Sequence, residues 1–345
     1  MSGRAASTPG APESGLRAAP GVVRIAVDLL GGDGAPAVVV DGALRACGAD
    51  PDLRLLLVGP QAVADELISA LPPGDRNRVS VRSLGGVVGM SDPPQKGSRP
   101  DTTVRGAAAA LVEDAADAMV SAGATGAVVT AAAVALGRWP GIRRPALIAT
   151  LPALRGPVVL IDVGGSVEAR PTTLAHHALL GAAYAAAVHG MAAPRVGLLS
   201  IGTEAGKGDR ARRAADPLLA GIKLGGDARY VGLVEAYDVA TGDRADVVVT
   251  DGFTGNVLLK GIEGAYAMAG GPPVSGGVPR AAALLGVRGT VVLCHGAATG
   301  DDVASGITLA AVLHRRGAVS RISATLDDIA DLSAPTSHRF PPDPR

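Results

Sequence analysis

Glycine-rich loops that carry polar side chains recur along this 345-residue chain and are its best candidates for chemistry. Each follows a short apolar run and precedes an alanine-rich stretch. Free backbone N–H groups at helix starts, with a nearby lysine, bind anions such as phosphate. An anionic ligand is therefore one interpretation, and the other is that Asp and Gly simply form good turns. The polar residues of these loops are Asp28, Asp33, Thr125, Asp162, Glu204, Lys207, Asp251, Asn256 and His295.

The common catalytic signatures are absent or weak. The chain has no Walker A motif, no G-x-S-x-G elbow and no paired zinc-ligand pattern, so no metal site is predicted. Residues 206–211 (GKGDRA) imitate a dinucleotide fingerprint, but no clear acidic residue follows about 20 positions later. This segment leaves a nicotinamide-dependent dehydrogenase open as an alternative. Cys294 precedes His295, and we interpret it as a buried structural thiol rather than a nucleophile.

Short β-branched and leucine-rich runs alternate with alanine-rich helical stretches along most of the chain. This alternation predicts an α/β fold, with a doubly wound, mostly parallel sheet covered by helices on both faces. Ligands of such sheets bind at the carboxyl ends of the strands, so we expect the polar loops to meet at one edge. The expected strands are 22–27, 53–58, 118–120, 158–161, 196–199, 247–249 and 291–293.

Composition narrows the functional classes. Hydrophobic residues make up 48% of the chain, enough for a large core, and 32 basic residues balance 32 acidic ones. This balance and the scarcity of aromatic residues argue against nucleic-acid binding. Two cysteines cannot make a disulfide framework, which favours a reducing cytosol. We expect one large α/β domain over residues 21–332, with room for two lobes around a cleft, between a disordered leader (1–20) and a loose tail (333–345).

Several loop motifs together resemble one known family, the PlsX-type phosphate acyltransferases of bacterial phospholipid synthesis. The resemblance runs from about Val23 to about Leu313, and the order and spacing of the motifs make it specific. The motifs are 25–36 (IAVDLLGGDGAP), 120–127 (VSAGATGA), 144–152 (RPALIATLP), 159–167 (VLIDVGGSV), 194–208 (PRVGLLSIGTEAGKG), 246–264 (DVVVTDGFTGNVLLKGIEG) and 284–296 (LLGVRGTVVLCHG).

The resemblance implies a fold of the isocitrate dehydrogenase and phosphotransacetylase type, a homodimer and no organic cofactor. The implied reaction moves a fatty acyl group from acyl carrier protein to inorganic phosphate. The acyl-phosphate product would feed phospholipid synthesis, with a glycerol-3-phosphate acyltransferase as a downstream partner.

On this resemblance Lys207, Asn256 and His295 are the predicted catalytic residues. Lys207 and Lys260 would neutralise charge, Asn256 and backbone amides would stabilise the oxyanion, and His295 would transfer a proton or orient phosphate. The predicted substrate-binding residues are Asp28, Gly31, Gly32, Asp33, Gly123, Thr125, Gly126, Asp162, Gly164, Glu204, Asp251, Gly252, Gly255, Lys260 and Gly296.

Departures from the family pattern remove polar side chains from the loops. Ala124 and Ser166 each stand where the family usually has Asn, and the lysine-rich segment is shortened to 99–103. They leave open a catalytically impaired paralogue that binds acyl carrier protein or acyl-phosphate.

The segment by which the family is thought to touch the bilayer is shortened as well. It is reduced here to 265–283, which holds one charge, Arg280, and is broken by Gly and Pro. We therefore expect a cytoplasmic protein without a membrane anchor.

Overall fold

The computed structural model describes residues 21–272 and 280–331, so the expected leader and tail lie outside the described residues. Eleven strands form one sheet. They are β1 (Val23–Asp28), β2 (Leu53–Gly59), β3 (Val79–Ser83), β4 (Ala118–Ser121), β5 (Ala146–Ala153), β6 (Gly156–Ile161), β7 (Arg195–Leu199), β8 (Arg229–Val234), β9 (Val247–Val249), β10 (Ala282–Leu285) and β11 (Thr290–Leu293).

Helices connect most of these strands, as the alternation predicts. The α-helices are α1 (Ala37–Ala49), α2 (Gln61–Ala70), α3 (Thr103–Val112), α4 (Thr125–Leu136), α5 (Pro171–His189), α6 (Arg210–Gly221), α7 (Ala236–Thr241), α8 (Gly252–Met268), α9 (Gly300–Arg315) and α10 (Ala318–Asp331), and the 3₁₀ helices are η1 (Pro73–Arg78) and η2 (Pro94–Ser98).

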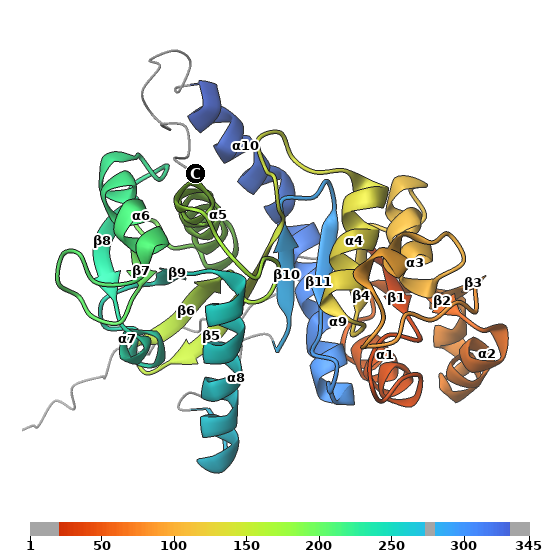
Figure 1. Ribbon diagram of the computed structural model, residues 1–345. Helices are drawn as coiled ribbons and strands as arrows, with labels where there is room; N and C mark the ends of the chain where they lie inside the picture. The colour runs from red at the N-terminus through yellow and green to blue at the C-terminus, as the bar shows by residue number, and fades with distance from the viewer. Residues whose placement is uncertain (1–20, 273–279, 332–345) are drawn as a thin grey trace, which may run out of the picture.

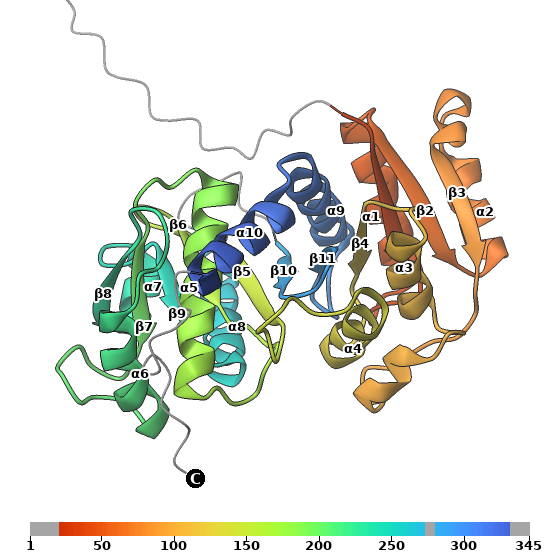
Figure 2. The same ribbon diagram turned by 90° about the horizontal axis from the view of Figure 1, so that it is seen from above.

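The strand order is β3-β2-β1-β4-β11-β10-β5-β6-β9-β7-β8. Figures 1 and 2 show this sheet running through the whole molecule, from β8 at one end to β3 at the other. Seven of its neighbouring pairs are parallel, and only β11–β10, β10–β5 and β5–β6 are antiparallel. The predicted α/β class with a mostly parallel sheet is confirmed.

The three antiparallel pairs correct one expectation. Because β5 and β6 form a hairpin and β10 pairs with β5 and β11, the four strands from β6 to β8 run opposite to the five from β3 to β11. The sequence analysis expected the carboxyl ends of all these strands to lie at one edge of the sheet. The two groups of strands instead end at opposite edges. The loop between β5 and β6 is too short for anything but an antiparallel pair, whereas a parallel crossover needs about a dozen residues.

Two apolar layers cover the two faces of the sheet. One contains Leu67 of α2, Leu174 of α5 and Val303 of α9, and the other contains Val128 of α4 and Ile262 of α8. These side chains are buried, as are the strand residues between the layers. Helices on both faces thus seal a sheet built almost entirely from Ala, Val, Leu and Ile.

Helix α8 is unusually exposed for an element next to the centre of the sheet. Figure 1 shows it extending away from the strands, and only Gly252, Gly255 and Ile262 are buried along it. Phe253 and Met268 are 63% and 92% exposed. The helix ends at Met268, and residues 273–279, on which the expectation of a broken helix rests, lie outside the described residues.

Candidate active site

The loop after β6 is organised around one buried carboxylate, Asp162. Its Oδ1 accepts N–H bonds from Leu147 (2.9 Å), Gly164 (3.0 Å) and Gly165 (2.7 Å). Its Oδ2 accepts from the backbone N–H and the hydroxyl of Ser166, both at 2.8 Å. Five donors on one carboxylate hold the loop in a single shape. Asp162, predicted to bind substrate, therefore positions the backbone that surrounds it.

The N-terminus of α8 packs directly on this loop. The Gly252 N–H donates to the Ser166 carbonyl oxygen at 2.7 Å, and Asn256 Nδ2 donates to the Val163 carbonyl oxygen at 3.0 Å. Gly255 touches the Asp162 backbone so closely that a Cβ there would lie 1.9 Å from the carbonyl oxygen. One amide hydrogen of Asn256 is thus used to dock the helix, and the other remains for a ligand.

Asp251 caps α8 and ties it to α6. Its Oδ1 accepts the Thr254 N–H at 2.8 Å, and its Oδ2 accepts Arg212 Nη2 at 2.7 Å. Arg212 is itself buried and also donates to Thr250 Oγ1 and to the Leu199 carbonyl oxygen. Burial alone would raise the pKa of Asp251, but the Thr254 and Arg212 hydrogen bonds outweigh it, and the pKa is lowered. Asp251 is therefore an ionised N-cap rather than a proton donor.

A second polar cluster lies at the ends of β1 and β4. Ser121 Oγ donates to Asp28 Oδ2 at 2.7 Å and accepts the Gly123 N–H at 3.0 Å. Burial raises the pKa of Asp28, against the hydrogen bonds from Thr103 and Ser121, which lower it. Gly31 approaches so closely that a Cβ there would lie 2.7 Å from the Gly123 nitrogen. Glycine is required at this crossing of two loops because any side chain would separate them.

The loop after β11 joins this cluster to α8. The Asp33 N–H donates to the Gly296 carbonyl oxygen at 2.8 Å, and Gly32, at φ +107°, packs against the same oxygen. Lys260 of α8 contacts His295 through Nζ and Nε2. A lysine and an imidazole in contact bring together a positive charge and a group that can accept and donate a proton.

The two clusters meet at Gly164. A Cβ built on Gly164 would lie 3.5 Å from Asn256 Nδ2 and 4.0 Å from Thr125 Cγ2. Thr125 and Gly126 open α4, so the first turns of α4 and α8 both lie beside the β6 loop. The predicted residues that form this connected cluster, which we call the loop ring, are Asp28, Gly31, Gly32, Asp33, Gly123, Thr125, Gly126, Asp162, Gly164, Asp251, Gly252, Gly255, Asn256, Lys260, His295 and Gly296.

Lys207 and Glu204 are the two predicted site residues that stand outside the loop ring. Both are exposed in the loop after β7, where the Lys207 N–H donates to the Glu204 carbonyl oxygen at 3.1 Å. Over the described residues, no hydrogen bond or ion pair joins either side chain to the ring. Their loop reaches it only indirectly, through Arg212, which pairs with both Asp209 and Asp251.

Cys294 behaves as the sequence analysis expects. It is buried, and burial raises the pKa of its thiol to about 12, which disfavours a thiolate nucleophile near neutral pH. Within the part of the chain that the structure describes, no group of three or more His, Cys, Asp and Glu residues could hold a metal ion.

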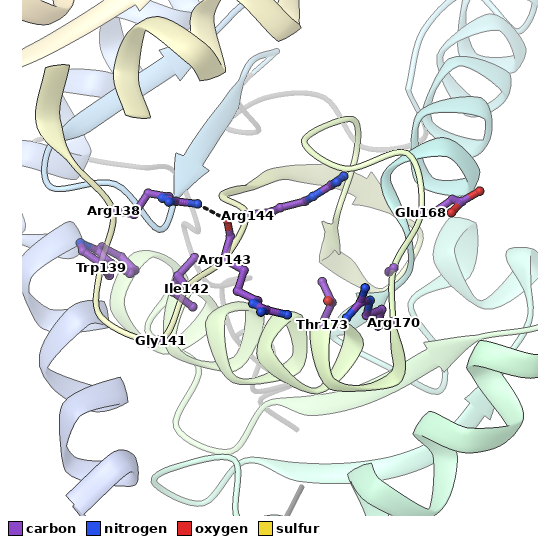
Figure 3. Close-up of a pocket in the computed structure, with 10 residues that line it drawn as sticks. Arg138, Trp139, Gly141, Ile142, Arg143, Arg144, Glu168, Arg170 and Thr173 are labelled. Atoms are coloured by element: carbon purple, nitrogen blue, oxygen red, sulfur yellow. Dashed lines mark hydrogen bonds between the residues drawn. The ribbon is translucent and has the colours of Figure 1, made fainter. Parts of the chain in front are cut away.

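A cavity that the sequence analysis did not predict lies beside the loop ring. It has a volume of about 1060 Å³. Figure 3 shows side chains from two segments around it, with Arg138, Arg143 and Arg144 in the segment before β5 and Arg170 at the start of α5. The run 138–145 (RWPGIRRP), with three arginines in seven residues, is the signal that could have indicated it.

Comparison with known proteins decides the family. Residues 23–271 match a family model described as "Fatty acid synthesis protein". A phosphate acyltransferase of Phenylobacterium zucineum is 38% identical over 326 residues, covering 86% of this chain and 92% of that protein. One from Desulfitobacterium hafniense is 42% identical over 246 residues, covering 70% and 71%. The chain belongs to the PlsX-type phosphate acyltransferase family.

A solved structure agrees with the fold of this phosphate acyltransferase. A phosphotransacetylase from Streptococcus pyogenes superimposes with a TM-score of 0.60 at 16% identity, over 87% of this chain and 94% of that one. At this identity the likeness shows the fold alone, which is the one the resemblance implied.

The structure also explains one departure from the family pattern. Ser166 supplies its hydroxyl to Asp162 Oδ2, so this loop of the acyltransferase keeps a polar side chain where Asn is usual. Ala124 is different, because it occupies the N-cap position of α4 and offers no side-chain acceptor to the helix. Of these two replacements, only Ala124 removes a hydrogen-bonding group from the ring.

Proposed function

We propose that this acyltransferase moves a fatty acyl group from an acyl carrier protein thioester to inorganic phosphate and releases acyl-phosphate for phospholipid synthesis. The observation that carries the proposal is the meeting of the α4 N-terminus with Gly164 and with Asn256, which lies on the same helix as the Lys260 that contacts His295. The start of α4, the Asn256 amide and a lysine form a site for a small, doubly charged anion.

The reaction needs no nucleophile from the protein. A phosphate oxygen attacks the thioester carbonyl carbon, the new C–O bond forms, and the C–S bond breaks as the tetrahedral intermediate collapses. Lys260 offsets the phosphate charge, and the free amide hydrogen of Asn256 stabilises the oxyanion. His295 takes the proton that the phosphate loses as the C–O bond forms and passes it to the departing thiolate.

The test is phosphate-dependent loss of the thioester. Purified protein is incubated with acyl carrier protein thioester and inorganic phosphate, and acyl-phosphate is trapped with hydroxylamine. We expect thioester loss to saturate with phosphate and to fall at least 100-fold in Lys260→Met, because an opposite charge at the transferring group is lost. Thioester loss that does not depend on phosphate would exclude the proposal.

We propose that the enzyme works in the cytoplasm as a homodimer that carries no membrane anchor. Over residues 21–272 and 280–331, no helix combines the length and the apolar character needed to cross a bilayer.

The exposed Phe253, Val257 and Met268 of α8 provide an apolar surface on which a second copy would pack. Analytical ultracentrifugation tests the dimer, and co-sedimentation with anionic liposomes that survives moderate salt would contradict the absence of an anchor.

A further inference from the structure

The cavity between the segment before β5 and the start of α5 is strongly cationic. Arg138, Arg143, Arg144 and Arg170 line it, and Glu168 is the acidic residue in its lining. In the described part of the chain no carboxylate lies within ion-pair distance of the first three guanidinium groups, whereas Arg24, Arg195 and Arg315 elsewhere all pair with aspartates. Uncompensated arginines gathered in one hollow are a site for an anion, and phosphate esters are the anions that guanidinium groups bind best.

The shape of the cavity selects a small organic molecule. Trp139 and Ile142, both buried, contribute to its wall beside the arginines, and Thr173 adds a hydroxyl in the first turn of α5. A volume of about 1060 Å³ far exceeds the space that inorganic phosphate needs. Charged groups in a hollow with an apolar wall suit a ligand with one anionic group and an uncharged, extended body.

The cavity shares a wall with the loop ring. Arg144 leads into Pro145, whose carbonyl oxygen would lie 2.7 Å from a Cβ on Gly165. Gly165 donates its N–H to Asp162, and Glu168 follows two residues after Ser166. A ligand anchored in the cavity therefore lies against the loop after β6. The first turns of α4 and α8 lie beside Gly164 of the same loop.

We propose that this cavity binds the phosphodiester of the phosphopantetheine arm that carries the acyl group. The inference rests on the proposed function, in which the acyl donor is a thioester of such an arm. Binding a remote anionic group of the donor contributes affinity and orients the thioester toward the phosphate at the loop ring.

Trp139 makes the proposal testable without any turnover, because it is the single tryptophan of the chain and lies in the cavity wall. We expect 4′-phosphopantetheine to change its fluorescence with saturation, and pantetheine, which lacks the phosphate, to bind at least tenfold more weakly. Arg143→Gln/Arg144→Gln should weaken 4′-phosphopantetheine binding at least tenfold, whereas Glu168→Gln should strengthen it two- to threefold. Arg244→Gln is the matched control, because Arg244 is an exposed arginine that precedes β9 and does not line the cavity. It should leave 4′-phosphopantetheine binding unchanged.

Three outcomes would overturn the proposal: equal binding of pantetheine and 4′-phosphopantetheine, competition by inorganic phosphate at equal affinity, or no effect of the double variant. Carrier protein without its arm provides a further test. If it binds as well as the armed form and loses affinity equally in the double variant, the arginines recognise the protein surface and not the arm. If 4′-phosphopantetheine binds as expected but no thioester loss occurs, the proposed function fails while the cavity assignment stands.

Discussion

Gly255 in the first turn of α8 offers a direct test of how the two halves of the site are held together. A Cβ at this position would lie 1.9 Å from the Asp162 carbonyl oxygen and 2.9 Å from Thr250 Cγ2. The carbonyl belongs to the loop backbone, which the Asp162 carboxylate holds with five hydrogen bonds. The obstacle is therefore rigid, and in Gly255→Ala the helix itself must move.

The size of that movement follows from the contact. Restoring a tolerable Cβ–O separation requires α8 to shift by about 1 Å, and overpacking of this kind costs about 2–3 kcal/mol. Because Lys260 lies on the same helix, the shift also displaces its ammonium group relative to His295. A displacement of about 1 Å in a positioning element lowers turnover by roughly 100-fold.

Gly261→Ala and Gly264→Ala are matched controls, since both glycines lie in α8 and a Cβ at either meets open space. Each should stabilise the protein by about 0.5–1 kcal/mol and leave turnover unchanged. Thermal unfolding and phosphate-dependent thioester loss measure the two effects. A Gly255→Ala variant with the melting temperature and rate of the native protein would refute the packing argument, and one with a lower melting temperature but full activity would refute the role of α8 in positioning Lys260.

Three further predictions concern single side chains. Lys207→Ala should lower kcat less than tenfold because the side chain lies outside the loop ring, and a loss as large as that of Lys260→Met would restore the sequence-based assignment of Lys207. Ala124→Asn should add an N-cap to α4 and raise the free energy of unfolding by about 1 kcal/mol, and an unchanged urea midpoint would contradict this. Burial, helped by nearby Arg316, lowers the pKa of His189 to about 4 from an ordinary 6.5, so the unfolded chain binds the extra proton first. Stability should therefore fall by up to about 3 kcal/mol as the pH drops from 6.5 to 4, and His189→Gln should flatten that slope in urea titrations.

Local patterns in the sequence predict much of this protein. Runs such as 247–249 and 291–293 are too short and too apolar to be anything but buried strands, and the glycine-rich turns after them mark the helix starts. The Asp-Gly-Phe-Thr-Gly-Asn segment at 251–256 contains the N-cap, the two glycines in close contact and the amide that dock α8. These features depend on neighbours within one or two turns, so their spacing along the chain is sufficient to identify them.

The tertiary structure decided which loops and side chains lie together in one site. Pairing of β10 with β5 joins residues more than 130 positions apart and connects the five strands from β3 to β11 with the four from β6 to β8, and no local pattern in either strand encodes that choice. It brings Thr125 next to Gly164 and leaves Lys207 outside, although all three follow a strand in the same way. The arginine-lined cavity likewise exists only because the segment before β5 folds over the start of α5. Residue types along the chain set the available chemistry, whereas long-range packing of buried strands and helices determined which of those residues share one site.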